Sequence, residues 1–159
     1  MELTKDKVQE LSKLPTGNIA DSVGPQFVMN SAIKPIDPKS KMVGRAVTVN
    51  CFAGDNLALH QGMSEAKSTY MVTGKDRVYV DHINEPISIS GVQVCPGDLI
   101  CADNTGVVVV PFKRAEEVLK VAHEIEAVEQ QIMAKIEAGM TLKEARQQTG
   151  YHKLQTPED

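Results

Sequence analysis

Apolar positions recur with helical spacing at the start of the chain. The first stripe contains Val8, Leu11 and Leu14 and ends at Pro15. Because residues three and four apart share one face of a helix, this stripe predicts a first helix. The next stretch, "TGNIADSV", predicts a second short helix over residues 16–23, with Thr16 as its N-cap and Gly24 as its end.

The middle of the chain changes to alternation with a period of two residues, which is typical of strands. "GRAVTVNCF", residues 44–52, predicts one half-buried strand. A strand-to-helix turn and a helix are expected in "AGDNLALHQGMSEAK", with Leu59, Met63 and Ala66 pointing inward. Further strands are expected in "DRVYVDHI", in "PISISGVQV" and on both sides of the tight-turn signal "NTG" at residues 104–106.

The last part of the chain is helical in pattern. A long amphipathic helix is predicted from Lys113 onward. Thr141 and Glu144 form a capping box that opens one more helix, and Gly150 closes it.

The order of these elements is helix, helix, strand, helix, several strands and long helix. It lacks the regular alternation of a βαβ fold and predicts a mixed α/β domain. We expect a single domain over residues 1–159, with its core at about residues 16–112 and C-terminal helices at about residues 113–150.

Composition narrows the class of protein. Hydrophobic residues are 42% and charged residues 24%, as in soluble globular domains, and aromatic residues are only 4%, so aliphatic side chains must fill the core. The net charge of −4 argues against a nucleic-acid partner. A solvated loop rim explains the clustered basic residues Lys34, Lys39, Lys41 and Arg45.

Neither a membrane nor an oxidising compartment is expected. The longest apolar run, residues 107–110, is far too short to span a bilayer, and the first ten residues contain no apolar signal region. Cys51, Cys95 and Cys101 are odd in number and lie in apolar, strand-like contexts, which is typical of reduced thiols. These features favour a cytoplasmic protein.

Two short stretches could bind an anion. Gly54, Asp55 and Asn56 follow a predicted strand and open a predicted helix, where free backbone N–H groups suit a carboxylate or phosphate. Asp55 or Asn56 could also be an ordinary helix cap, and the bare sequence favours that interpretation. Lys75 follows Gly74 in a turn, where an exposed lysine is the simpler explanation.

The remaining reactive side chains give no sharper signal. The four histidines, His60, His82, His123 and His152, show no close ligand spacing and are expected to be structural or at the surface. The acidic residues of the long helix are by default a solvated face. Residue chemistry alone therefore names no catalytic group.

Several stretches taken together resemble the RraA-like family, which includes the regulator of ribonuclease activity A and the 4-hydroxy-4-methyl-2-oxoglutarate aldolases. They occur in order from about residue 16 to about residue 139: "TGNIADSVG", "GRAVTV", "GDNLALH", "PISISGVQVCPGDLICADNTGVVVVP" and the helix with "EEVLK". The block from Ile87 to Pro111 is the most specific, because its "PGDL", "AD" and "GVVVVP" are hard to obtain together by chance.

This resemblance implies a swivelling β/β/α domain that assembles as a homotrimer or hexamer, with active sites between subunits. It implies a divalent metal, usually magnesium with manganese as an alternative, and a small 2-oxo acid substrate. In similar enzymes the metal and nearby N–H donors stabilise the enolate of pyruvate as a C–C bond breaks. The aldolases of the family also decarboxylate oxaloacetate.

The chain departs from the family pattern between His60 and Val78. Family members continue after the "GDN" helix with further strands, a glycine-rich loop and an "RD" motif whose aspartate holds the metal, and none of these occurs here. We expect a join near Lys67 and Ser68, so that the α/β domain is shortened. The remaining strands must then pair across a gap or expose an edge.

The resemblance assigns a role in the site to only a few residues of this chain. Gly54, Asp55 and Asn56 match the family's "GDN", which borders the substrate, and Lys75 matches a lysine near it. In the family, an acidic residue of the C-terminal helix contributes to the active site of a neighbouring subunit. The candidates for this catalytic role in this chain are Glu126 and Glu129. No metal ligand can be named. Asp98 and Asp103 are expected to be turn and strand-end structure.

Two functions follow from this pattern. The first is a lyase that cleaves or decarboxylates 2-oxo acids, of the aldolase and oxaloacetate decarboxylase type. The second is a non-catalytic regulatory or assembly protein that binds another protein, such as a ribonuclease. The absent "RD" segment favours the second function, and the family's enzymes favour the first.

Overall fold

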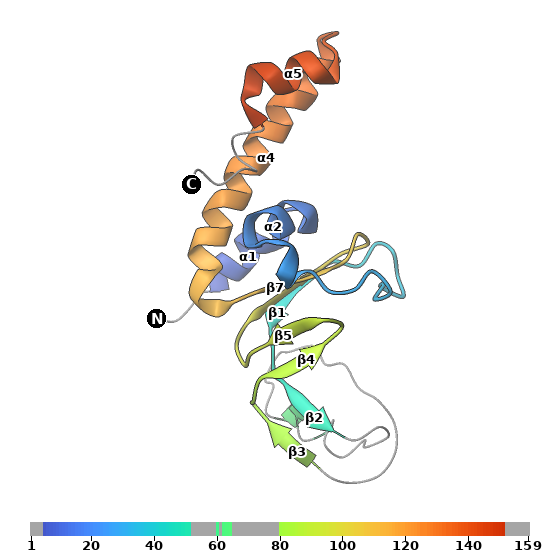
Figure 1. Ribbon diagram of the computed structural model, residues 1–159, viewed down its shortest axis with the longest axis vertical. Helices are drawn as coiled ribbons and strands as arrows, with labels where there is room; N and C mark the ends of the chain where they lie inside the picture. The colour runs from blue at the N-terminus through green and yellow to red at the C-terminus, as the bar shows by residue number, and fades with distance from the viewer. Residues whose placement is uncertain (1–4, 52–59, 61, 65–79, 152–159) are drawn as a thin grey trace.

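The protein is described from a computed structural model, which defines residues 5–51, 60, 62–64 and 80–151. Helices cover one side of a three-stranded sheet, short pairs of strands lie toward its other side, and the C-terminal helices extend away as an arm (Figure 1). This arrangement agrees with the predicted mixed α/β class.

The two predicted N-terminal helices are present. They are α1 (Lys5–Lys13) and α2 (Thr16–Val23), and a short 3₁₀ turn, η1 (Pro25–Phe27), follows them. The prediction that Thr16 caps α2 is wrong, because Pro15 holds the N-cap position and Thr16 is already helical. The amide of Thr16 instead donates to the Asp103 carboxylate, 3.1 Å away. Asp103, 87 positions away in the sequence, thus accepts the hydrogen bond of a backbone amide at the N-terminus of α2.

The central sheet has the order β1-β6-β7 and is antiparallel throughout. Its strands are β1 (Met42–Arg45), β6 (Leu99–Ala102) and β7 (Val107–Val110). The predicted turn joins β6 to β7, with the amide of Asp103 donating to the Gly106 carbonyl at 3.1 Å. One face of this sheet packs on α1, α2 and the C-terminal helix to form the main core, which includes Leu11, Ile19, Leu99, Val108 and Val118.

The single strand predicted over residues 44–52 is wrong. The chain leaves the central sheet after Arg45 and forms a separate strand, β2 (Val49–Cys51), which pairs with β3 (Val80–Ile83). Backbone bonds at Ala46 fix this break: its amide donates to the Asp98 carbonyl at 2.7 Å, and its carbonyl accepts from the Gly97 amide at 2.9 Å.

The stretch "PISISGVQV" forms a hairpin rather than one strand. Its strands are β4 (Ile87–Ile89) and β5 (Val92–Val94), paired in antiparallel register. Ser90 and Gly91 form the turn with positive φ angles of 49° and 84°. Two consecutive left-handed residues match the twist of a tight hairpin, and the glycine inside the strand-like pattern was the signal for it.

The C-terminal arm follows the predicted pattern. A 3₁₀ turn, η2 (Phe112–Arg114), leads into α4 (Ala115–Glu137), and α5 (Leu142–Thr149) folds back beside it. The capping box is confirmed, because Thr141 and Glu144 bond each other's backbone amides. α5 packs on the distal half of α4 through a small core of Ile132, Ala145 and Tyr151.

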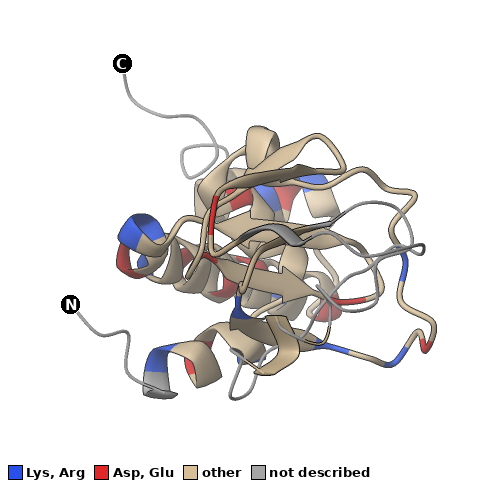
Figure 2. Ribbon diagram, turned by 90° about the horizontal axis from the view of Figure 1, so that it is seen from below, with Lys and Arg blue, Asp and Glu red and all other residues tan. Residues whose placement is uncertain are grey.

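The charged residues are mixed in sign over the helical side, and the connection before β1 carries mostly basic side chains (Figure 2). Lys34, Lys39, Lys41 and Arg45 are all exposed, as a solvated rim requires. Met63 is 54% exposed, so its predicted inward orientation is wrong. Within the described ranges, no helix combines the length and the apolar character needed to cross a bilayer.

Candidate functional site

Glu126 and Glu129 lie together where α4 crosses α2. They are three residues apart and therefore share one side of α4. The side chain of Asn18, only 5% exposed, donates from Nδ2 to Glu126 Oε2 at 2.8 Å and to Glu129 Oε2 at 3.0 Å. The structure thus gathers the two predicted acidic residues around one buried amide.

Two further side chains complete this carboxylate cluster. Gln130 Nε2 donates to Glu126 Oε1 at 2.9 Å, and the Tyr151 hydroxyl donates to Glu129 Oε1 at 3.2 Å. Burial raises the pKa of Tyr151, and the negative charge of Glu129 raises it further. The Arg146 guanidinium lies 5.1 Å from the centre of the Tyr151 ring. Both carboxylates are half-buried, and each accepts from two donors.

The fold explains why these residues meet. Asn18 is a polar residue on the packed side of the short helix α2, and burial of its amide without partners would be costly. Tyr151 reaches Glu129 because α5 folds back after a left-handed glycine, Gly139, with φ of 96°. Sequence reasoning missed both Asn18 and Tyr151. The signal for Asn18 was a hydrogen-bonding side chain inside the "TGNIADSV" pattern.

The cluster does not amount to a metal centre. Among the described residues, no group of three His, Cys, Asp or Glu side chains could hold a metal ion. Glu126 and Glu129 instead accept hydrogen bonds from two side-chain amides, those of Asn18 and Gln130, and from the phenol of Tyr151. The arrangement holds two carboxylates in a fixed orientation where α4 crosses α2.

Asp98 and Asp103 have the structural roles predicted for them. Asp98 accepts from the Cys95 amide at 2.8 Å and from the Phe112 amide at 3.0 Å, and so joins the turn before β6 to the turn before α4. Burial raises the pKa of Asp103, but hydrogen bonds from Thr105 and Thr16 outweigh it and lower that pKa to about 2.

The structure does not describe the other residues that were predicted to bind substrate. Gly54, Asp55, Asn56 and Lys75 lie outside the described residues. His60 and His123 are exposed, in agreement with a surface role. Cys101 is a free, fully buried thiol, and burial raises its pKa to about 12 against the opposing charge of Lys41.

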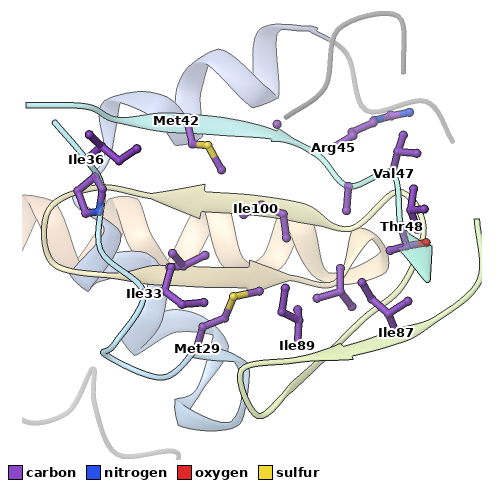
Figure 3. A pocket seen from close by; sticks show the side chains of 16 residues that line it. Met29, Ile33, Ile36, Met42, Arg45, Val47, Thr48, Ile87, Ile89 and Ile100 are labelled. Carbon is purple, nitrogen blue, oxygen red and sulfur yellow. The ribbon is translucent and has the colours of Figure 1, made fainter. Parts of the chain in front are cut away.

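A second feature lies on the opposite side of the central sheet from the helices. It is an apolar groove of about 480 Å³ bounded by β1, β4, β6 and the connection after α2 (Figure 3). The lining side chains include Met29, Ile33, Ile36, Met42, Val47, Val49, Ile87, Ile89, Ile100 and Val107. Sequence reasoning did not predict this groove, although it did predict a gap in the strands.

A model of a protein family matches this chain. The family model described as RraA-like, Aldolase/RraA, matches residues 16–77 and residues 65–109. The two pieces overlap within the stretch where the sequence predicts a join.

Two curated relatives are similar to this chain. Protein DlpA of Legionella pneumophila is 43% identical over 82 residues, which is 52% of this chain and only 13% of that protein. A "Putative 4-hydroxy-4-methyl-2-oxoglutarate aldolase" of Halalkalibacterium halodurans is 27% identical over 177 residues, 77% of this chain and 84% of that protein. The second alignment is longer than this chain's own 159 residues, so the relative contributes a stretch without counterpart here.

Several solved structures share the fold. An uncharacterized protein from Pseudomonas syringae has a TM-score of 0.66 at 21% identity, covering 92% of this chain and 99% of that one. Streptomyces coelicolor RraAS2, described as an unusual member of the RNase ES inhibitor RraA protein family, has a TM-score of 0.61 at 16% identity, covering 82% of this chain and 96% of that one. The family match, with the α/β fold and its C-terminal helical arm, shows that this chain belongs to the RraA-like family.

Proposed function

We propose that this protein is a lyase that cleaves or decarboxylates small 2-oxo acids, releasing pyruvate from 4-hydroxy-4-methyl-2-oxoglutarate or from oxaloacetate. The observation that carries this proposal is the alignment with a relative named as such an aldolase, which extends over 84% of that relative. The pair of oriented carboxylates on α4 supports it, because the family's reaction calls for an acidic residue from this helix.

In this proposal the site forms between subunits of a homotrimer or hexamer. Glu126 and Glu129 serve the neighbouring subunit, and Asn18 and Tyr151 hold their carboxylates in place. Gly54, Asp55 and Asn56 bind the substrate carboxylate through backbone N–H groups, and Lys75 adds a positive charge beside it.

The expected magnesium has no donor set among the residues that the structure describes. A bound divalent ion would supply Lewis-acid stabilisation of the enolate. The roles that belong to this chain's own residues are the binding of the substrate carboxylate, its orientation and the placement of an acid near the broken bond.

The test is a coupled assay of pyruvate release from both substrates, with magnesium, with manganese and with a chelator. We expect metal-dependent release, a loss of at least about tenfold in Lys75→Ala, and a comparable loss in Glu129→Gln. Glu124→Gln is the matched control, because Glu124 is exposed on the same helix. The melting temperature of each variant separates a catalytic loss from a folding loss.

Equal activity of all three variants would refute the assigned roles. Absence of pyruvate release under every metal condition, from a folded oligomer, would refute the lyase itself.

A second candidate function has its own support. The aldolase relative carries a stretch that this chain lacks. This difference favours a protein that binds another protein, such as a ribonuclease, without chemistry of its own. The discriminating measurement is titration of ribonuclease activity with this protein: inhibition without pyruvate release supports the regulator, and release without inhibition supports the lyase.

A further inference from the structure

The oxygen atoms of Glu126 and Glu129 all accept hydrogen bonds, but their donors differ in how readily they move. We propose that Glu126 is the carboxylate available to the substrate of a neighbouring subunit, whereas Glu129 is a positioning residue that holds α5 against α4 and acts on Glu126 through Asn18. The role of Glu126 in the reaction rests on the proposed lyase. The difference between the two carboxylates does not.

Both donors of Glu129 lie in packed parts of the molecule. Asn18 is 5% exposed and Tyr151 is 7% exposed. Tyr151 belongs to the small core with Ile132 and Ala145, which holds α5 beside α4 (Figure 1). Withdrawal of its hydroxyl from Glu129 therefore requires that α5 separate from α4. Rotation of Glu129 itself would remove an acceptor from two buried donors, which is costly.

The second donor of Glu126 is of a different kind. Gln130 is exposed and lies one turn further along the same helix. A pair of this kind on a helix surface is weak, and the amide can turn into water by rotation of its own side chain. Oε1 of Glu126 then becomes available to another group, while Oε2 keeps its hydrogen bond from Asn18 at 2.8 Å.

The same difference applies to a proton. An acid that gives a proton to a substrate must carry it on an oxygen that the substrate can reach. Oε2 of Glu126 faces an N–H group of Asn18, which cannot accept a proton, so the proton belongs on Oε1. There Gln130 either accepts it through its amide oxygen or turns away. On Glu129 the corresponding oxygen faces the buried hydroxyl of Tyr151, which keeps a proton enclosed.

Asn18 joins the two carboxylates into one unit. Its amide nitrogen donates one hydrogen to each, at 2.8 Å to Glu126 and at 3.0 Å to Glu129. The two hydrogens of one amide are fixed relative to each other, so a shift of Glu129 lets the amide turn and moves Glu126. A change at Glu129 therefore lowers an activity that Glu126 performs, without contact between Glu129 and the substrate.

The first experiment measures the reactivity of each carboxylate in the intact protein. A water-soluble carbodiimide with glycinamide converts accessible carboxylates to amides, and fragmentation of the labelled peptide in a mass spectrometer separates Glu126 from Glu129. We expect Glu126 to react about tenfold faster than Glu129, because Glu129 reacts only after local opening of the arm. Glu124, which is exposed on the same helix, gives the rate of an unprotected carboxylate. Equal rates, or a faster reaction of Glu129, would overturn the proposal.

A variant of Tyr151 tests the positioning role. Tyr151→Phe removes only the hydroxyl; we expect it to raise the labelling rate of Glu129 toward that of Glu126 and to speed amide hydrogen exchange in α5. Gln130→Ala is the matched control, because it removes a donor of the cluster that does not belong to α5, and both readouts should stay as in the wild type. Unchanged exchange in Tyr151→Phe would overturn the positioning role. The wild-type labelling still decides the proposal if Tyr151→Phe fails to fold.

Kinetics give the readout that depends on the lyase. Glu126→Gln should lower kcat about 100-fold with KM unchanged, because it removes the proton donor, whereas Glu129→Gln should lower kcat only about tenfold. The reverse order would overturn the role of Glu126. Absence of pyruvate release from the wild type would refute the proposed lyase and, with it, the catalytic role of Glu126. The labelling rates would then decide the division between the two carboxylates by themselves.

Discussion

Replacement of Asn18 by alanine is the most direct perturbation of the carboxylate cluster. The change removes two hydrogen bonds to charged acceptors, at 2.8 Å and 3.0 Å, and leaves Glu126 and Glu129 half-buried without that donor. A hydrogen bond to a charged group contributes about 1.5–3 kcal/mol. The carboxylates retain Gln130 and Tyr151 as donors, so the lower end applies, and the two bonds together give about 3 kcal/mol.

For a chain of this size, about 3 kcal/mol corresponds to a fall in melting temperature of roughly 6–12 °C. The assay is urea and thermal denaturation followed by circular dichroism at neutral pH. Asn104→Ala serves as the matched control, because Asn104 is exposed in the turn between β6 and β7, and it should change stability by less than about 0.5 kcal/mol.

The loss of stability in Asn18→Ala should depend on the charges of Glu126 and Glu129. In a double-mutant cycle, Asn18→Ala should cost much less in a Glu126→Gln, Glu129→Gln background, because the unpaired charges are then absent. A loss below about 1 kcal/mol in the native background, or full additivity in the cycle, would refute the argument.

Three further outcomes follow from the structure. Asp103→Asn should lower the free energy of unfolding by about 1 kcal/mol at neutral pH, after allowance for solvent screening. Because folding lowers the pKa of Asp103 from 3.8 to about 2, this contribution is present above pH 3.8 and is lost as the pH falls toward 2. Urea titrations in acid should therefore give the variant and the wild type equal stability. Cys101, whose pKa burial raises to about 12, should resist iodoacetamide in the native protein and react only after unfolding, and mass spectrometry of the labelled peptide would show an adduct if this is wrong. Thr141→Ala should destabilise α5 by about 1 kcal/mol, and unchanged amide exchange at the start of α5 would contradict the capping role.

The candidate site could be predicted only in part from the sequence. Glu126 and Glu129 were singled out by resemblance to the family. Their partner Asn18 lies more than 100 positions away, and no local pattern connects the two. Tyr151 meets Glu129 because of the reversal between α4 and α5, which depends on how two helices pack.

The strand region shows a similar limit. The strand predicted over residues 44–52 overlaps only the end of β1 and contains β2, because a period of two continues through residues 46–48. The break there depends on backbone bonds from Ala46 to Gly97 and Asp98, which are distant in the sequence. The hairpin of β4 and β5 was readable in principle, since Ser90 and Gly91 form a two-residue turn.

The sequence by itself determined the elements whose causes are local. Helical stripes, the Thr141 capping box, the glycine ends and the "NTG" turn each depend on neighbouring residues, and the α/β class follows from their order. Only the tertiary structure decided which strands share a sheet, which carboxylate caps α2, and what surrounds Glu126 and Glu129. It also decided that an apolar groove lies on the side of the central sheet opposite the helices, because burial depends on the whole set of elements that pack together.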